Sequence, residues 1–165
     1  MVRRLILMRH AKSDWANQHL SDHDRPLNER GRRSAPLMAK QFANNNLTPV
    51  AIVASTAARV RETLALMLAE WRHEPEVRFQ KSLYLASVET LKTHVSGLLD
   101  SWSDALIVGH NPGLMDFASW LAGQPLEMPT AGVVVFEADG ESWSEAVATR
   151  NWQLKALWKP RDLFD

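Results

Sequence analysis

Residues 2–10 read V-R-R-L-I-L-M-R-H, and this stretch decides the fold of the chain. Leu5 to Met8 form an unbroken apolar run of strand length, without the alternation of a strand that exposes one face to water. Such runs are typical of strands in a parallel sheet that helices cover on both faces. Arg9 and His10 follow at once, so two polar side chains stand at the carboxyl end of this predicted strand.

The remaining sequence alternates between helix-like and strand-like segments. Apolar residues at helical spacing predict helices over residues 28–46, 57–71, 88–99 and 112–122. Short apolar runs predict further strands at residues 50–54, 77–79, 105–108 and 133–136, and a last strand within 152–158. We expect a turn at Asp139-Gly140 to pair the strand at 133–136 with one near Ser142-Trp143. This alternation predicts an α/β fold, a three-layer α/β/α sandwich with a mostly parallel central sheet, as a single domain over residues 1–165.

The composition excludes several classes of protein. None of the 165 residues is cysteine, which rules out disulfides, thiolate metal sites and a cysteine nucleophile. Lys and Arg together number 19, as do Asp and Glu, so the chain lacks the basic excess typical of nucleic-acid binders. No apolar stretch reaches the roughly 18 residues of a membrane span, and the run at 5–8 is too short for a signal peptide. We therefore expect a cytoplasmic protein that binds neither nucleic acid nor membranes.

Two further polar residues stand near the ends of predicted strands. His110 follows the apolar strand at 105–108, and Arg59 lies in the first turn of the helix after the next strand end. The dipole of a helix disfavours a cation in its first turn, so Arg59 requires a negative partner. Ligands of α/β proteins bind beyond the carboxyl ends of the strands, where Arg9, His10, Arg59 and His110 are expected to gather. Two histidines and two arginines predict an anion site, and the planar arginine fork suits phosphate.

Five motifs, spread in order along nearly the whole chain, resemble those of one known family. They are L-I-L-M-R-H at 5–10, D-R-P-L-N-E-R-G at 24–31, S-T-A-A-R-V-R-E-T at 55–63, V-G-H-N-P-G at 108–113 and M-P-T-A-G-V-V-V-F-E at 128–137. The chain resembles the histidine phosphatase superfamily, which has the phosphoglycerate mutase-like fold. The family usually has glycine after the histidine of the first motif, where this chain has Ala11. The short length, without the insertions of the mutases, is similar to the SixA-type phosphohistidine phosphatases.

The resemblance implies a role for each residue of the cluster. His10 is the expected nucleophile, which attacks phosphorus as a neutral imidazole and forms a phosphohistidine intermediate that water hydrolyses. His110 is expected to donate to the phosphoryl oxygens. The expected catalytic residues are His10, Arg9, Arg59 and His110, and the expected phosphate-binding residues are Arg9, Arg59, His110, Ser13 and Asn111. We expect neither a metal ion nor another cofactor, because the arginines supply the positive charge.

Two departures from the family pattern bear on the substrate. Mutase-like relatives use a glutamate to protonate the leaving oxygen, and the candidates here, Glu74, Glu76 and Glu89, include no convincing match. Glu89 is expected on the solvated face of a helix. Ala16 stands where relatives with the fuller motif have asparagine. A phosphoramidate needs no such acid, because its leaving imidazole can already carry a proton, so we expect a partner protein that carries phosphohistidine, such as a phosphotransfer domain.

Three other interpretations stay open. In the first, the same fold acts on small phosphate esters, and in the second it binds phosphohistidine without catalysis. In the third, His19, Asp22, His23 and Asp24 contribute to a metal site, although a polar loop of this composition is more often only a loop. Trp15, in the same loop, is a candidate flat contact for the substrate. The sequence leaves the oligomeric state open.

Overall fold

A computed structural model describes residues 1–163, and the last two residues of the expected domain, 164–165, lie outside the described residues. Over residues 1–163, six strands form one sheet in the order β3-β2-β4-β1-β5-β6. β1, β2, β3 and β4 pair in parallel, whereas β5 runs antiparallel to both of its neighbours. The mostly parallel sheet is therefore confirmed. The strands are Val2–Arg9 (β1), Ala51–Ser55 (β2), Glu76–Gln80 (β3), Asp104–Gly109 (β4), Val133–Asp139 (β5) and Gln153–Trp158 (β6).

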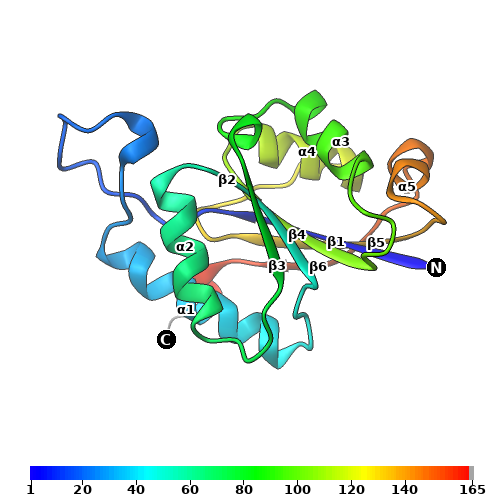
Figure 1. Cartoon of the computed structure of the whole chain (residues 1–165), viewed down its shortest axis with the longest axis horizontal. Coiled ribbons are helices and arrows are strands. Elements are labelled where there is room, and N and C mark those ends of the chain that lie inside the picture. The colour runs from blue at the N-terminus through cyan, green and yellow to red at the C-terminus, as the bar shows by residue number, and fades with distance from the viewer. Residues whose placement is uncertain (164–165) are drawn as a thin grey trace.

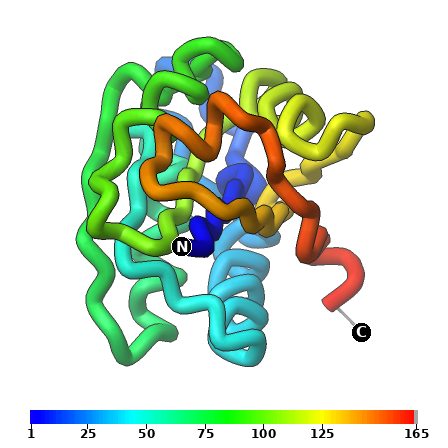
Figure 2. The backbone as a smooth tube through the Cα atoms, turned by 90° about the vertical axis from the view of Figure 1, so that its right-hand side faces the viewer, coloured from blue at the N-terminus to red at the C-terminus, as the bar shows by residue number. Residues whose placement is uncertain are grey.

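Helices cover both faces of the sheet and complete the predicted three layers (Figure 1). Because alternate residues of a strand point to opposite faces, Ile6 and Met8 pack beneath α1 and α2, whereas Leu5 and Leu7 pack on the side of α3, α4 and α5. In the turned view of Figure 2 the N-terminus faces the viewer, with α1 below it and α4 above. The helices of the described chain are Glu29–Asn44 (α1), Ala58–Leu68 (α2), Val88–Ser96 (α3), Gly113–Ala122 (α4) and Trp143–Thr149 (α5). None of them is both long and apolar enough to cross a membrane.

The strand expected near Ser142-Trp143 is wrong, because these residues begin the helix α5. The Ser142 side chain accepts a hydrogen bond from the backbone N–H of Glu145 and caps the first turn. A serine followed three residues later by glutamate is a known signature of a helix start. Trp143 is fully buried against the sheet, which fixes the helix on this face.

The carboxyl ends of β1, β4 and β2 lie at one edge of the sheet. Arg9 at the end of β1 is in register with Gly109 at the end of β4, and Ala54 of β2 is in register with Val108. The loop over residues 11–25 extends from this edge, at the opposite end of the molecule from the N-terminus (Figure 1). Its one regular element is the 3₁₀ helix Asp22–Asp24. The polar residues that follow three different strands are thereby brought together.

Gly31 holds the first turn of α1 against the chain that follows His10. A Cβ at this position would lie 2.2 Å from the Lys12 carbonyl oxygen and 2.9 Å from the Lys12 nitrogen. Overpacking of this kind costs about 1–3 kcal/mol. We therefore expect Gly31→Ala to lower the free energy of unfolding by about that amount, measured by urea denaturation. Gly109→Ala is the control, because its Cβ would meet no side chain or backbone atom nearer than 4.0 Å. Equal destabilisation by the two variants would contradict this account.

Candidate active site

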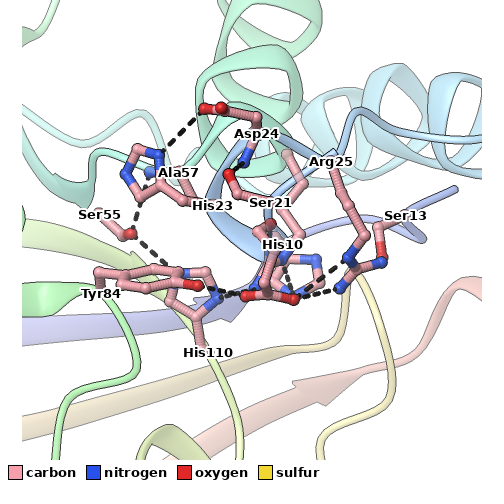
Figure 3. Close-up of polar contacts among 12 residues, drawn as sticks. His10, Ser13, Ser21, His23, Asp24, Arg25, Ser55, Ala57, Tyr84 and His110 are labelled. Atoms are coloured by element: carbon pink, nitrogen blue, oxygen red, sulfur yellow. Dashed lines mark hydrogen bonds and ion pairs between the residues drawn. The ribbon is translucent and has the colours of Figure 1, made fainter. Parts of the chain in front are cut away.

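The two candidate histidines lie side by side at the edge of the sheet (Figure 3). The ring centroids of His10 and His110 are 5.2 Å apart, and the two residues are only 5% and 3% exposed. The backbone of His10 is held on both sides, because its N–H donates to Gly109 and its carbonyl accepts from Ala131. The sheet itself therefore fixes the position of His10.

The hydrogen bonds of the His10 ring determine which nitrogen is free to react. Nδ1 lies 2.6 Å from the Ala11 carbonyl oxygen, which can only accept, so Nδ1 carries the proton. Nε2 then has the lone pair, and it accepts from Nε of Arg59 at 3.3 Å. The unprotonated nitrogen thus faces the cluster of positive charge. This is the tautomer that a nucleophilic imidazole needs.

Burial is the largest cause that lowers the pKa of His10 to about 4. The hydrogen bond to Ala11 opposes this shift, and the positive charges of Arg59, Arg9 and Arg25 add to it. His10 is therefore neutral at pH 7, as the predicted mechanism requires.

We expect the ring nitrogens of His10 to show the neutral Nδ1–H tautomer from pH 8 down to about pH 5. Because the pKa of His10 is lower in the folded chain than in the unfolded chain, between these two pKa values the unfolded chain binds a proton that the folded chain does not. Stability is then fully present above pH 6.5 and falls as the pH drops toward 4. A nitrogen-15 NMR titration, with His10 assigned through His10→Asn, measures this directly. A titration midpoint for His10 near the ordinary value of about 6.5 would contradict it.

Arg59 connects the two histidines to the loop at 11–25. Its guanidinium contacts Nδ1 of His110 at 3.3 Å, as well as Nε2 of His10. On its other side it donates to the backbone oxygen of Asp22 at 2.7 Å and to the Asp22 carboxylate at 3.1 Å. Asp22 is therefore the negative partner that the position of Arg59 predicted.

The side chains of Arg59 and Ser55 already engage both ring nitrogens of His110. Arg59 can only donate, so Nδ1 of His110 accepts, and Nε2–H donates to Ser55 Oγ at 2.7 Å. Burial chiefly lowers the pKa of His110 to about 3, with His10 and Arg59 adding to the shift. Donation from His110 to a phosphoryl oxygen thus requires a second proton at Nδ1. A dianion beside Arg59 would favour that proton.

Sequence reasoning missed the importance of Asp22, Arg25 and Tyr84. The buried Arg25 donates twice to the Asp22 carboxylate, at 3.1 and 2.9 Å, and lies 3.3 Å from the ring centroid of Trp15. The Tyr84 hydroxyl donates to the other Asp22 oxygen. Burial raises the pKa of Asp22, but hydrogen bonds from Tyr84, Arg25 and Arg59 outweigh it and hold the pKa well below the usual range. The available signal was the pair of opposite charges at positions 22 and 25.

Ser13 and Asn111 lie close to the cluster, but protein atoms already engage their side chains. Ser13 Oγ accepts from Arg25 at 2.7 Å, so it positions that guanidinium. The Asn111 amide donates to the Met128 carbonyl at 2.8 Å and accepts from the backbone N–H of Met115 at 3.2 Å. Arg9 contacts the same Met128 carbonyl at 3.3 Å, whereas its buried Nε has no partner within residues 1–163.

The catalytic cavity, as we name it, has a volume of about 270 Å³ at this edge of the sheet. Three guanidinium groups and one carboxylate line it, which leaves a formal charge of +2 when the histidines are neutral. A dianionic phosphoryl group would balance that charge. The lining residues are Arg9, His10, Trp15, Asp22, Arg25, Arg59, Leu85, His110 and Asn111.

Three other candidates from the sequence do not line the catalytic cavity, namely His23, Asp24 and Glu89. His23 contacts Thr56 Oγ1 at 2.8 Å through Nε2, and Asp24 is exposed. Among residues 1–163, no three His, Asp or Glu side chains are grouped closely enough to hold a metal ion. The Glu89 side chain is 84% exposed and forms an ion pair with Lys92 at 3.2 Å. The prediction that Glu89 lies on a solvated helix face is confirmed.

Comparison with known proteins identifies the class to which this site belongs. The family model of the histidine phosphatase superfamily (branch 1) matches residues 5–83. An uncharacterised chloroplastic protein of Arabidopsis thaliana is 35% identical, over 96% of this chain and 78% of that protein. An uncharacterised protein of Mycobacterium leprae is 32% identical, over 93% of this chain and 100% of that protein. The chain belongs to the histidine phosphatase superfamily, and its class of activity is that of a phosphatase.

Solved structures narrow this assignment to the SixA type. A candidate phosphohistidine phosphatase SixA from Nakamurella multipartitia is 28% identical, covers 97% of both chains and has a TM-score of 0.82. The corresponding candidate from Agrobacterium tumefaciens is 27% identical, with a TM-score of 0.81 over 96% of this chain and 99% of that one. Both confirm the SixA-type resemblance found in the sequence. The protein histidine phosphatase SixA complexed with tungstate shares the fold at 18% identity, with a TM-score of 0.83 over 98% and 99% of the chains.

Proposed function

We propose that this protein removes the phosphoryl group from phosphohistidine on another protein, without a metal ion, through an intermediate on His10. The observation that carries the proposal is that the carboxylate of Asp22 stays ionised. Among the described residues, Asp22 is the one carboxylate that lines the catalytic cavity, and the hydrogen bonds of Tyr84, Arg25 and Arg59 keep it ionised. An ionised carboxylate cannot protonate the leaving oxygen of an ester. A leaving imidazole does not need that proton.

In the first step of this mechanism, Nε2 of His10 attacks phosphorus and the bond from phosphorus to the substrate imidazole breaks. The substrate imidazole departs neutral when its other ring nitrogen already carries a proton. Arg9, Arg25 and Arg59 face the phosphoryl oxygens, whose charge is spread over three equatorial positions during transfer. One imidazole replaces another, so the bond formed resembles the bond broken and the two states are close in free energy.

In the second step, water attacks the phosphorus and the bond to His10 breaks. The proton stays on Nδ1 throughout and is donated in a hydrogen bond to the Ala11 carbonyl, so His10 leaves the phosphoryl group as a neutral imidazole. The attacking water gives up one proton to the phosphate or the solvent. The same tautomer thus serves His10 as nucleophile in the first step and as leaving group in the second.

Exposed apolar side chains at the mouth of the catalytic cavity favour a protein substrate. Trp15 and Leu85 both line the cavity, and they are 70% and 54% exposed. Leu85 also has a positive backbone φ of 50°, which is uncommon for a bulky residue away from functional sites. Apolar groups held at an entrance in this way provide a contact for a protein surface and none for a small anion.

We expect Leu85→Asn to raise KM for a phosphorylated carrier protein about fivefold, because one apolar interface contact is worth about 1 kcal/mol. Asparagine tolerates the positive φ, so the loop keeps its path. The kcat with the carrier protein as substrate, and both kinetic constants with free phosphohistidine, are expected to stay unchanged. The matched control is Leu99→Asn, at a leucine that is 44% exposed and does not line the catalytic cavity. An equal effect on free phosphohistidine would contradict a role in protein contact.

The experiment that tests the proposed function compares three substrates, each with and without a chelator. These are a carrier protein phosphorylated on histidine, free phosphohistidine and glycerol phosphate. We expect release of phosphate from the first two and release from glycerol phosphate slower by a factor of about 10³ or more, because an alkoxide leaves poorly without an acid. Rapid turnover of glycerol phosphate would favour the small-ester alternative. Binding of the carrier protein without release would favour the non-catalytic module, and loss of activity with chelator would favour a metal-dependent mechanism.

A further inference from the structure

A second and larger cavity adjoins the catalytic cavity at the same edge of the sheet. Its volume is about 420 Å³, which falls within the range of ligand-binding clefts. It lies between the start of α1, the start of α4, the loop before β5 and the segment after β6. Arg9 and Asn111 line both cavities and stand between them. We call this space the basic cavity.

The charge of the basic cavity is strongly positive. It is lined by the cations Arg9, Lys12, Arg30, Lys159 and Arg161, and Glu127 is the one acidic residue among its described lining. Within residues 1–163, neither Lys12 nor Lys159 forms an ion pair, and Arg161 has only a contact of 3.9 Å with Asp162. Like charges gathered around one space repel one another, so an anion placed among them is attracted.

Apolar residues line the basic cavity together with the cations. The half-buried Met115 and Pro129 contribute to its walls, together with the buried Met128 and Pro160. Methionine side chains adapt to the shape of a partner, and they are frequent on surfaces that bind peptide segments. A site for a second small phosphate would need only the cations and backbone donors. The mixture of cations with methionine and proline instead fits a chain segment that presents acidic and apolar side chains together.

We propose that the basic cavity binds an acidic segment of the phosphoprotein, next to the histidine whose phosphoryl group enters the catalytic cavity. This inference rests on the proposed function for the identity of the substrate. Because Arg9 lines both cavities, the phosphoryl group and the acidic segment would bind on either side of its side chain. A substrate that carries both groups therefore gains binding free energy from both cavities. The basic cavity would thus select among phosphohistidine proteins by the carboxylates that surround their phosphohistidine.

The test uses the double variant Lys12→Gln with Lys159→Gln, which removes two cations outside the catalytic cavity. The control is Lys40→Gln with Lys155→Gln, since both of these lysines are exposed and line neither cavity. We expect kcat/KM for a carrier protein with glutamates beside its phosphohistidine to fall about tenfold in the double variant. Free phosphohistidine is expected to change less than about twofold, and the control to match the wild type on both substrates.

A second arm measures binding without catalysis. A fluorescent peptide of glutamate and leucine that carries no phosphate is expected to bind the wild type and not the double variant. If this binding is found but no phosphate is released from the carrier protein, the proposed function fails and the acidic-segment site stands. Equal losses on the carrier and on free phosphohistidine, no loss on either, or the same tenfold loss on a small bisphosphate would each overturn the inference.

Discussion

Replacing His10 by alanine is expected to reduce phosphate release by a factor of about 10⁴ or more, since loss of a nucleophile removes the covalent route entirely. The remaining arginines would still bind the phosphoryl group, so binding of the carrier protein is expected to persist. His10 is neutral and buried, and its removal leaves a small cavity without an unpaired charge. The fold should therefore remain, which thermal unfolding of the variant can verify.

The matched control for this variant is His94→Ala. His94 lies on α3, where its Nε2 contacts Ser82 Oγ at 2.7 Å, and it does not line the catalytic cavity. We expect phosphate release by this control to stay within about twofold of the wild type. More than about 1% residual activity in His10→Ala, or an equal loss in His94→Ala, would contradict the role of His10 as nucleophile.

Arg59→Lys is expected to reduce kcat by a factor of about 10² to 10³, which is the usual loss when an oxyanion donor is removed. The planar fork of Arg59 reaches His10, His110 and Asp22 at the same time. A lysine ammonium is a single point of charge and cannot span these three partners. Because lysine keeps the positive charge, this variant tests the contribution of the guanidinium geometry separately from that of the charge.

Arg61→Lys is the control for this substitution on the same helix. Arg61 is exposed, donates to the Thr56 carbonyl at 3.0 Å and stacks on Phe79 away from the histidines. Its replacement is expected to change kcat less than about twofold. Retention of more than half of kcat by Arg59→Lys, measured under saturating substrate, would show that charge alone suffices at this position.

Much of the candidate site follows from local signals in the sequence. The unbroken apolar runs at 5–8 and 105–108 mark strands buried on both faces, and in a parallel sheet their ends must meet at one edge. The position of Arg59 in the first turn of a helix indicates a missing negative charge, and Asp22 supplies it. The meeting of the strand ends depends on periodicity and strand direction, and the need of Arg59 for a negative partner depends on its place in the helix. A single sequence is enough to predict both, but it does not identify Asp22 as that partner.

The contacts of the loop at 11–25 could not be predicted in the same way. Whether Asp22 faces solvent or Arg59 depends on the path of an irregular segment, and nothing in its periodicity specifies that path. Tyr84 reaches Asp22 across 62 positions of the sequence. The tautomer of His110 is another tertiary property, because it follows from which of Arg59 and Ser55 contacts each ring nitrogen.

The most direct test of the account is to trap the phosphoryl group on His10. The wild-type protein would be mixed with a carrier protein that carries ³²P-phosphohistidine and quenched within milliseconds. We predict a transient label on this chain that acid removes and alkali preserves, and that mass spectrometry assigns to His10. Release of phosphate with no labelled chain at any time, or a label on another residue, would contradict the account.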